Sequence, residues 1–246
     1  MKYFILSMVL LGSITLVITI NQDTFAKGLD YQQANIKNGA QLYDNWPKMK
    51  KADIKDTHPL YPATSKKSGK STWRCKECHG WDYIGKNGRY SKGSHFTGIN
   101  GVYHVRTAEP GNLFKSLTDK AHKHEFSAYL ADKEVWDLVK FIREGQVAIE
   151  TVLDEQGGAK GDVAKGKVLY NANCSACHGD DGNEIDFKGK KEGIQGVGWL
   201  ANDNPQETLH KIRWGHPDSD MPSMIVDAKL TDQDAVDILK YSQSQE

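Results

Sequence analysis

The sequence predicts an all-α fold built from two tandem helical units, and three observations support this prediction. The motif C-x-x-C-H occurs twice, as CKECH at 75–79 and CSACH at 174–178. Other segments match between the halves in the same order, which indicates an internal repeat of about a hundred residues. The segments that begin and end each unit place apolar residues at helical spacing, whereas the stretches between them are rich in glycine.

Matched segments frame each unit. NGAQLYDN pairs with KGKVLYNA, which aligns Gly39 with Gly166 and Tyr43 with Tyr170. GINGV pairs with GIQGV in the loops that follow the cysteine motifs. LADKEVWDLVKFI pairs with LTDQDAVDILKYS, and each of these predicts a final helix that begins at an acidic capping candidate, Asp132 or Asp232.

The first residues have the layout of a secretory signal. Lys2 precedes an uncharged apolar run at 3–20, and Thr24 and Ala26 stand at the −3 and −1 positions of a cleavage after Ala26. The run also reaches the ~18 residues that can cross a bilayer, so an uncleaved N-terminal anchor is the alternative to a signal peptide at 1–26. Both predict that the rest of the chain is exported to the periplasm, with no further membrane span.

The rest of the chain divides into a first unit at 27–145, a linker at 146–161 and a second unit at 162–246. The linker matches nothing in the repeat and ends in glycines. The first unit carries an insertion at 44–71, because its matched tyrosine and cysteine are 32 residues apart, against 4 in the second unit. Three prolines and seven lysines in the insertion predict a surface loop beside the first cysteine motif.

The formal net charge is zero, yet the two halves differ in charge. Residues 27–145 contain 21 Lys and Arg against 13 Asp and Glu, a net of +8. Residues 160–246 contain 10 against 15, a net of −5. Such an imbalance concerns docking partners rather than fold. It suits protein partners of opposite charge or reflects two surfaces that are solvated differently, and nucleic acid is not expected as a partner.

Every cysteine belongs to one of the two C-x-x-C-H motifs, which are attachment signatures of c-type haem. On a helix of ~3.6 residues per turn, positions i, i+3 and i+4 share one face. Two thiols can then form thioethers to the haem edge while the histidine nitrogen reaches the iron. Two disulfides are the alternative for an exported chain. A zinc site would need more ligands at each copy, and a thioredoxin-like pair does not require the histidine. The motifs therefore predict two covalent haems, attached through Cys75, Cys78, Cys174 and Cys177, with His79 and His178 on the irons.

With these motifs the chain resembles the class I c-type cytochromes, fused in tandem as a dihaem protein, over nearly all of 30–241. The resemblance implies two cytochrome c-like domains, each wrapped around one haem. It also implies that the first and last helices of each domain cross closely at Gly39 and at Gly166. The proline that this family often places near the iron-bound histidine is absent from GINGV and GIQGV.

The second axial ligand of each iron decides the redox character. For the second haem the candidate is Met221, which is followed by Pro222 as in the family, with Met224 as its local competitor. The first unit has no methionine after its cysteine motif, and the segment KAHKHEF offers His124, with His122 two residues away. The remaining candidates for the first iron are His95, His104, Met49, His58 and an open position.

A thioether favours ferrous iron and raises the potential, whereas a second imidazole lowers it. We therefore hypothesise a low-potential first haem that passes electrons to a high-potential second haem. The predicted function is that of a periplasmic dihaem cytochrome that transfers single electrons between a donor and an acceptor protein. No catalytic residue is assigned, and an electron carrier is favoured over an enzyme.

Three alternatives stay open. They are a peroxidase-like dihaem oxidoreductase with an open iron position, a gas-sensing module, and an electron-transfer subunit of a larger oxidoreductase. Around the haems, Arg74 is a candidate partner of a propionate or an exposed charge. Trp199 and Trp214 are candidate walls of the second pocket or ordinary core residues.

Overall fold

The computed structural model describes residues 30–65, 67–121, 123–187, 189 and 193–245. The signal peptide or anchor predicted at 1–26 and one candidate ligand, His122, lie outside the described residues. Within these ranges, every helix is too short or too polar to cross a bilayer.

The regular structure of the described residues is helical, as the sequence predicts, and it is accompanied by two isolated β-bridges, Gly85 with Asn100 and Leu153 with Ala159. The α-helices of the first half are α2 (Ile36–Met49), α3 (Cys75–His79), α4 (Pro110–Thr118) and α5 (Asp132–Lys140), the last continuing into the π-helical turn η4 (Phe141–Gly145). Those of the second half are α7 (Val163–Asn173), α8 (Ser175–His178), α9 (Val197–Asp203), α10 (Pro205–Trp214) and α11 (Asp232–Gln243), and α6 (Ile149–Val152) lies between the halves in sequence. Three short 3₁₀ turns are η1 (Gly69–Trp73), η2 (Arg89–Ser91) and η3 (Tyr103–Val105).

In each half the first and last helices cross at a glycine. A Cβ on Gly39 of α2 would collide with the carbonyl of Asp137 on α5, and a Cβ on Gly166 of α7 would collide with the carbonyl of Asp237 on α11. Only glycine permits so close an approach of two helix backbones. The crossing implied by the family resemblance is therefore present in both halves.

Side-chain caps begin the crossing helices. Asn35 accepts a hydrogen bond from the backbone N–H of Asn38 at the start of α2, and Asp162 does the same for Lys165 at the start of α7. Helix α11 is capped by Thr231, not by the expected Asp232, because the Thr231 hydroxyl oxygen accepts the third backbone N–H of the helix. Asp232 is the first helical residue instead.

The two halves have separate apolar cores, and one tryptophan lies in the core of the other half. Trp214 at the end of α10 packs among first-half residues, with its ring centroid 6.0 Å from that of Phe141. The prediction that Trp214 forms a wall of the second pocket is therefore wrong. Its position reflects the contact of α10 with the first half, which the sequence of α10 alone does not show.

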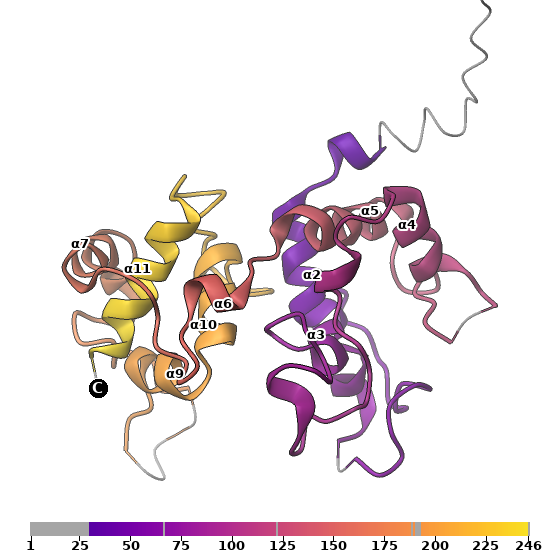
Figure 1. The fold of residues 1–246 in the computed structure, drawn as a ribbon, viewed down its shortest axis with the longest axis horizontal. Coiled ribbons are helices and arrows are strands. Elements are labelled where there is room, and N and C mark those ends of the chain that lie inside the picture. The colour runs from indigo at the N-terminus through magenta and orange to yellow at the C-terminus, as the bar shows by residue number, and fades with distance from the viewer. Residues whose placement is uncertain (1–29, 66, 122, 188, 190–192, 246) are drawn as a thin grey trace, which may run out of the picture.

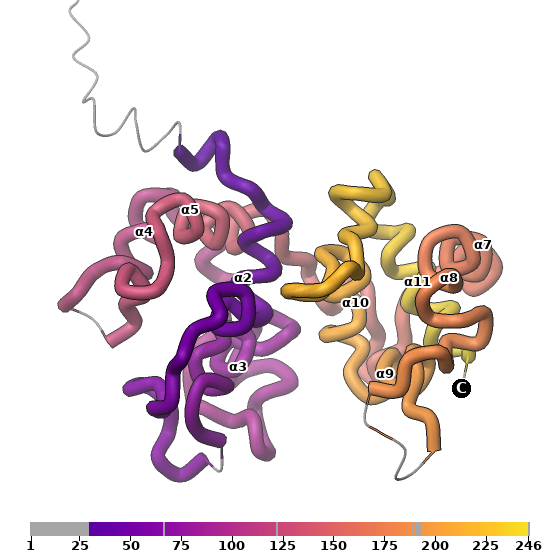
Figure 2. Tube along the Cα trace, turned by 180° about the vertical axis from the view of Figure 1, so that it is seen from behind, coloured from indigo at the N-terminus to yellow at the C-terminus, as the bar shows by residue number. Residues whose placement is uncertain are grey.

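The halves lie side by side, and α10 is on the side of the second half that faces α2 in both views (Figures 1 and 2). Several hydrogen bonds cross this interface. Gln41 Nε2 donates to the carbonyl of Trp214 (3.0 Å), and Arg213 Nη1 donates to the carbonyl of Gly145 (2.7 Å). An exposed ion pair joins Lys37 to Asp227 (2.5 Å).

The residues expected to form a linker pack against the second half. Leu153 and Ala159 are buried there, and α6 contacts the same apolar core. The expected insertion begins inside α2, which continues past a kink at Asn45 with Pro47 in its last turns. The rest of the insertion runs along the first cysteine motif.

Candidate haem sites

The first cysteine motif faces two cavities that meet around it. A cavity of about 320 Å³ and a smaller one of about 80 Å³ share Cys75, His79 and His124 as lining residues. The larger cavity is also lined by Cys78 and by His58 of the insertion. The short helix α3 thus presents both thiols and the histidine of its motif to one apolar space.

The rings of the two histidines of this site lie at a separation that suits a single metal between them. The ring centroids of His79 and His124 are 6.0 Å apart and their planes are nearly perpendicular, at 86°. Two imidazoles bound to opposite sides of one metal ion, at about 2 Å per bond, have ring centroids roughly 6 Å apart.

Hydrogen bonds fix which nitrogen each ring offers to a metal. His79 Nδ1 lies 2.7 Å from the carbonyl of Asn100, and His124 Nδ1 lies 3.4 Å from the carbonyl of Ser116. A carbonyl only accepts, so each Nδ1 carries the proton and each Nε2 keeps its lone pair for a metal. Burial lowers the pKa of His79 to about 4 and lowers the pKa of His124, which favours the neutral rings that bind metals.

His58 is the other histidine that lines the larger cavity, and its hydrogen bond has the opposite sense. The backbone N–H of Leu60 donates to His58 Nδ1 (3.2 Å), so the proton of the neutral ring is on Nε2. That Nε2 is buried and has no hydrogen-bond partner among the described residues. In this tautomer His58 is a donor toward the cavity rather than a metal ligand.

The other candidate ligands of the first iron are occupied or distant. His95 contacts Glu77 (3.1 Å) and stacks on Tyr90. His104 is exposed beside a different cavity, and Met49 packs against the first-half core.

The second cysteine motif lines one cavity of about 490 Å³. Cys174 and His178 are on its wall, whereas Cys177 is exposed at the surface. Met221 lines the same cavity, and its local competitor Met224 is buried in the second-half core. The structure thus brings Met221, and not Met224, to the cavity that contains His178. Trp199 also lines this cavity, as expected.

In the ranges described, the second site lacks one feature of the first, which is a carbonyl that accepts from Nδ1 of the motif histidine and so orients its ring toward a metal. His178 Nδ1 is buried and, within the part of the chain that the structure describes, lacks a hydrogen-bond partner. Gln195 occupies the place of Asn100 in the repeat, but its carbonyl accepts from the backbone N–H of Phe187 (3.0 Å) instead. Burial lowers the pKa of His178, which keeps the ring neutral.

In each half, the hydroxyl of a tyrosine at the helix crossing donates a hydrogen bond to the backbone just after the cysteine motif. Tyr43 donates to the carbonyl of Gly80 (2.6 Å), and Tyr170 donates to the carbonyl of Gly179 (3.1 Å). Each glycine directly follows the histidine of its motif, and both have positive φ, at 81° and 79°. The first helix of each half thereby fixes where the cysteine helix ends.

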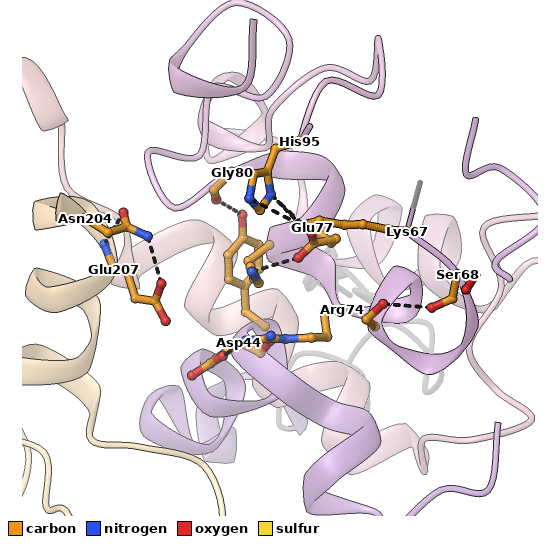
Figure 3. A network of polar contacts seen from close by, with 12 residues as sticks. Asp44, Lys67, Ser68, Arg74, Glu77, Gly80, His95, Asn204 and Glu207 are labelled. Carbon is orange, nitrogen blue, oxygen red and sulfur yellow. Dashed lines mark hydrogen bonds and ion pairs between the residues drawn. The ribbon is translucent and has the colours of Figure 1, made fainter. Parts of the chain in front are cut away.

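Arg74, a candidate partner of a propionate, is engaged elsewhere. Its Nη2 donates to Asp44 Oδ1 (2.6 Å) and its Nε donates to the Asp44 carbonyl (2.8 Å), as Figure 3 shows. Figure 3 also shows Glu77, which lies between the motif cysteines and is contacted by Lys67 and His95.

Sequence reasoning missed three polar residues around the sites: Asp44, Glu77 and Lys211. Only Glu77 has a signal in the sequence, since it is a carboxylate inside the first motif and a lysine-rich segment precedes it. Burial of this carboxyl raises its pKa, but His95, Lys76 and Lys67 outweigh that effect and hold it well below its usual range.

Comparison with known families agrees with this geometry for the second half. The Cytochrome c family model matches residues 163–246, so a cytochrome c domain occupies this part of the chain. Such domains carry covalently bound haem c and take part in electron transfer. No curated protein and no solved structure matches the chain.

Proposed function

We propose that the protein is a dihaem c-type cytochrome in which residues 27–145 form a second cytochrome c-like domain. The observation that carries this proposal is the repetition of one set of contacts in both halves. Each half has a glycine at a helix crossing and a tyrosine that donates to the residue after the motif. Each also has a carboxylate on its last helix, Asp137 or Asp237, that accepts the backbone N–H at the start of its first helix.

When bound, each haem would supply reversible one-electron chemistry at its iron. The chain's own residues hold and orient the group. Cys75 and Cys78, and likewise Cys174 and Cys177, would attach its edge, and His79 and His178 would bind the irons. Asn100 orients His79 through its carbonyl, and the apolar cavity walls exclude water.

The second axial donors differ between the two sites in this proposal. His124 would complete the first site and Met221 the second, which would make the first haem low in potential and the second high. Electrons would then enter at the first haem and leave from the second. The donor and acceptor are redox proteins, with the basic first half facing an acidic partner and the acidic second half a basic one.

Export to the periplasm belongs to the same proposal, because the chain combines the haem-attachment motifs with a segment at 1–26 that has the layout of a secretory signal. That segment acts as a signal peptide or remains as an anchor.

The mass of the mature protein tests the number of haems, and low-temperature electron spin resonance tests their ligands. We expect two added haems and two low-spin ferric signals. A single added haem would refute the dihaem proposal. A high-spin signal that responds to cyanide would instead favour the peroxidase-like enzyme or a gas sensor.

A further inference from the structure

A buried carboxylate pairs with one cation from the first half and one from the second half. Asp44, on α2, has no exposed surface, and its two carboxylate oxygens have different cationic partners. Oδ1 accepts from Nη2 of Arg74 (2.6 Å), and Oδ2 accepts from Nζ of Lys211 on α10. Figure 3 shows Asp44 and Arg74 from close by. The second of these ion pairs crosses from one half of the chain to the other.

Each cation belongs to a different cavity. Arg74 lines the larger cavity of the first half and directly precedes Cys75, whereas Lys211 lines the cavity of the second half. Asp44 is therefore the common partner of one cation from each cavity. Lys211 is further held by Trp81 of the first half, with its Nζ 5.4 Å from the ring centroid.

The bridge stays charged in its surroundings. Burial raises the pKa of Asp44, but Lys211 and Arg74 together outweigh that effect and leave the pKa below its usual value. Both cations are largely shielded from water, at 22% and 10% side-chain exposure, so their fields are weakly screened. A charge in such surroundings acts more strongly on a nearby site than the same charge in water.

We propose that Asp44, with Arg74 and Lys211, is a positioning and tuning bridge shared by the two haem sites. It holds α10 against α2 and sets the electrostatic potential at both irons. The inference rests on the proposed dihaem function. It adds a residue outside the motifs to the determinants of both midpoint potentials.

The sign of the effect follows from the charges. Ferric haem carries one more positive charge than ferrous haem, so a nearby carboxylate stabilises the ferric form and lowers the midpoint. Asp44→Asn removes the negative charge and keeps the shape of the side chain, and it should raise both midpoints. Lys211→Met removes a positive charge and leaves the Asp44–Arg74 pair, and it should lower the midpoint of the second haem most.

The test is a spectroscopic redox titration of the holo-protein and of these variants, with Asp227→Asn as matched control. Asp227 also forms an ion pair between the halves, with Lys37, but that pair is exposed and lines neither haem cavity. We expect an upward shift of both midpoints in Asp44→Asn, a downward shift in Lys211→Met, and no shift in Asp227→Asn. If Asp44→Asn does not accumulate, the direction of the midpoint shift in Lys211→Met decides whether the charges of the bridge act on the irons as proposed.

Unchanged midpoints in Asp44→Asn, a shift of one haem only, or an equal shift in Asp227→Asn would overturn the shared bridge. The mass of each holo-protein separates this result from failure of the dihaem proposal. Two haems with unshifted midpoints reject only the role of Asp44, whereas one haem rejects the dihaem function itself.

Discussion

His210 of α10 is hydrogen-bonded on both sides to the first half: its Nε2 donates to the carbonyl of Ala40 on α2 (3.1 Å), and its Nδ1 accepts from the hydroxyl of Tyr83 (3.0 Å). The ring is buried, with 1% exposure. The bond from Tyr83 requires the neutral ring, because a protonated Nδ1 could not accept it. The interface between the halves is therefore built on an uncharged histidine.

This contact predicts that the protein loses stability as the pH falls below neutrality. Burial lowers the pKa of His210 to about 3, so between that value and the unfolded pKa of about 6.5 the unfolded chain binds more protons. The free energy of unfolding should fall with pH in this window, by at most about 1.4 kcal/mol per pH unit from this group.

Denaturant unfolding of the holo-protein at pH 7, 6, 5 and 4 measures the effect. In His210→Gln the decline should be shallower than in the wild type, whereas His104→Gln, which changes an exposed histidine, should follow the wild type. Parallel declines in His210→Gln and the wild type would contradict the prediction.

The helix crossings predict a severe cost for any side chain at Gly39 or Gly166. A Cβ at either position would collide with a backbone carbonyl, which cannot move as a flexible side chain can. Gly166→Val should lower the free energy of unfolding by at least about 3 kcal/mol, by overpacking the crossing. Thermal unfolding of the holo-protein measures the loss.

Gly111→Ala in α4 is the matched control for the glycine substitutions. A Cβ there meets no atom within 4 Å, so the change should be neutral or stabilise the helix by up to about 1 kcal/mol. A Gly166→Val protein as stable as the wild type would show that the helices do not approach as described.

The helical framework could be predicted from sequence because its determinants are local and repeated. The glycine and tyrosine of each first helix, and the spacing of each cysteine motif, recur in both halves and fix the crossing and the end of the motif. The same repetition located the cavity residues Met221 and His124, through their place before the last helix.

The contacts between the halves could not be predicted in this way. Asp44 and Lys211 are 167 residues apart in sequence, and the polar residues of α10 resemble an ordinary solvated helix face. The expected place of Trp214 in the second pocket is wrong for the same reason, because its partners belong to the other half. His58 lies in the insertion, which has no counterpart in the repeat, so the repeat does not point to it.

The hydrogen bonds of the first site predict different outcomes for its two histidines. His124→Ala should convert the first haem from low-spin to high-spin and open it to carbon monoxide, because the donor opposite His79 is lost. His58→Gln should keep the low-spin spectrum, because His58 offers a proton rather than a lone pair. Electron spin resonance and carbon monoxide binding distinguish the two. A high-spin first haem in His58→Gln, together with an unchanged low-spin spectrum in His124→Ala, would show that His58 and not His124 is the ligand.

The second site predicts that one of two nearby methionines governs the potential of its iron. Met221 lines the cavity with His178, whereas Met224 is 4% exposed in the core. Met221→His should replace the thioether by an imidazole and lower the midpoint of the second haem, since imidazole favours ferric iron. Met224→Leu preserves the core volume, should cost less than about 1.5 kcal/mol of stability, and should leave both midpoints in place. Redox titration of both variants decides the assignment, and a fall in midpoint for Met224→Leu but not for Met221→His would give the ligand role to Met224.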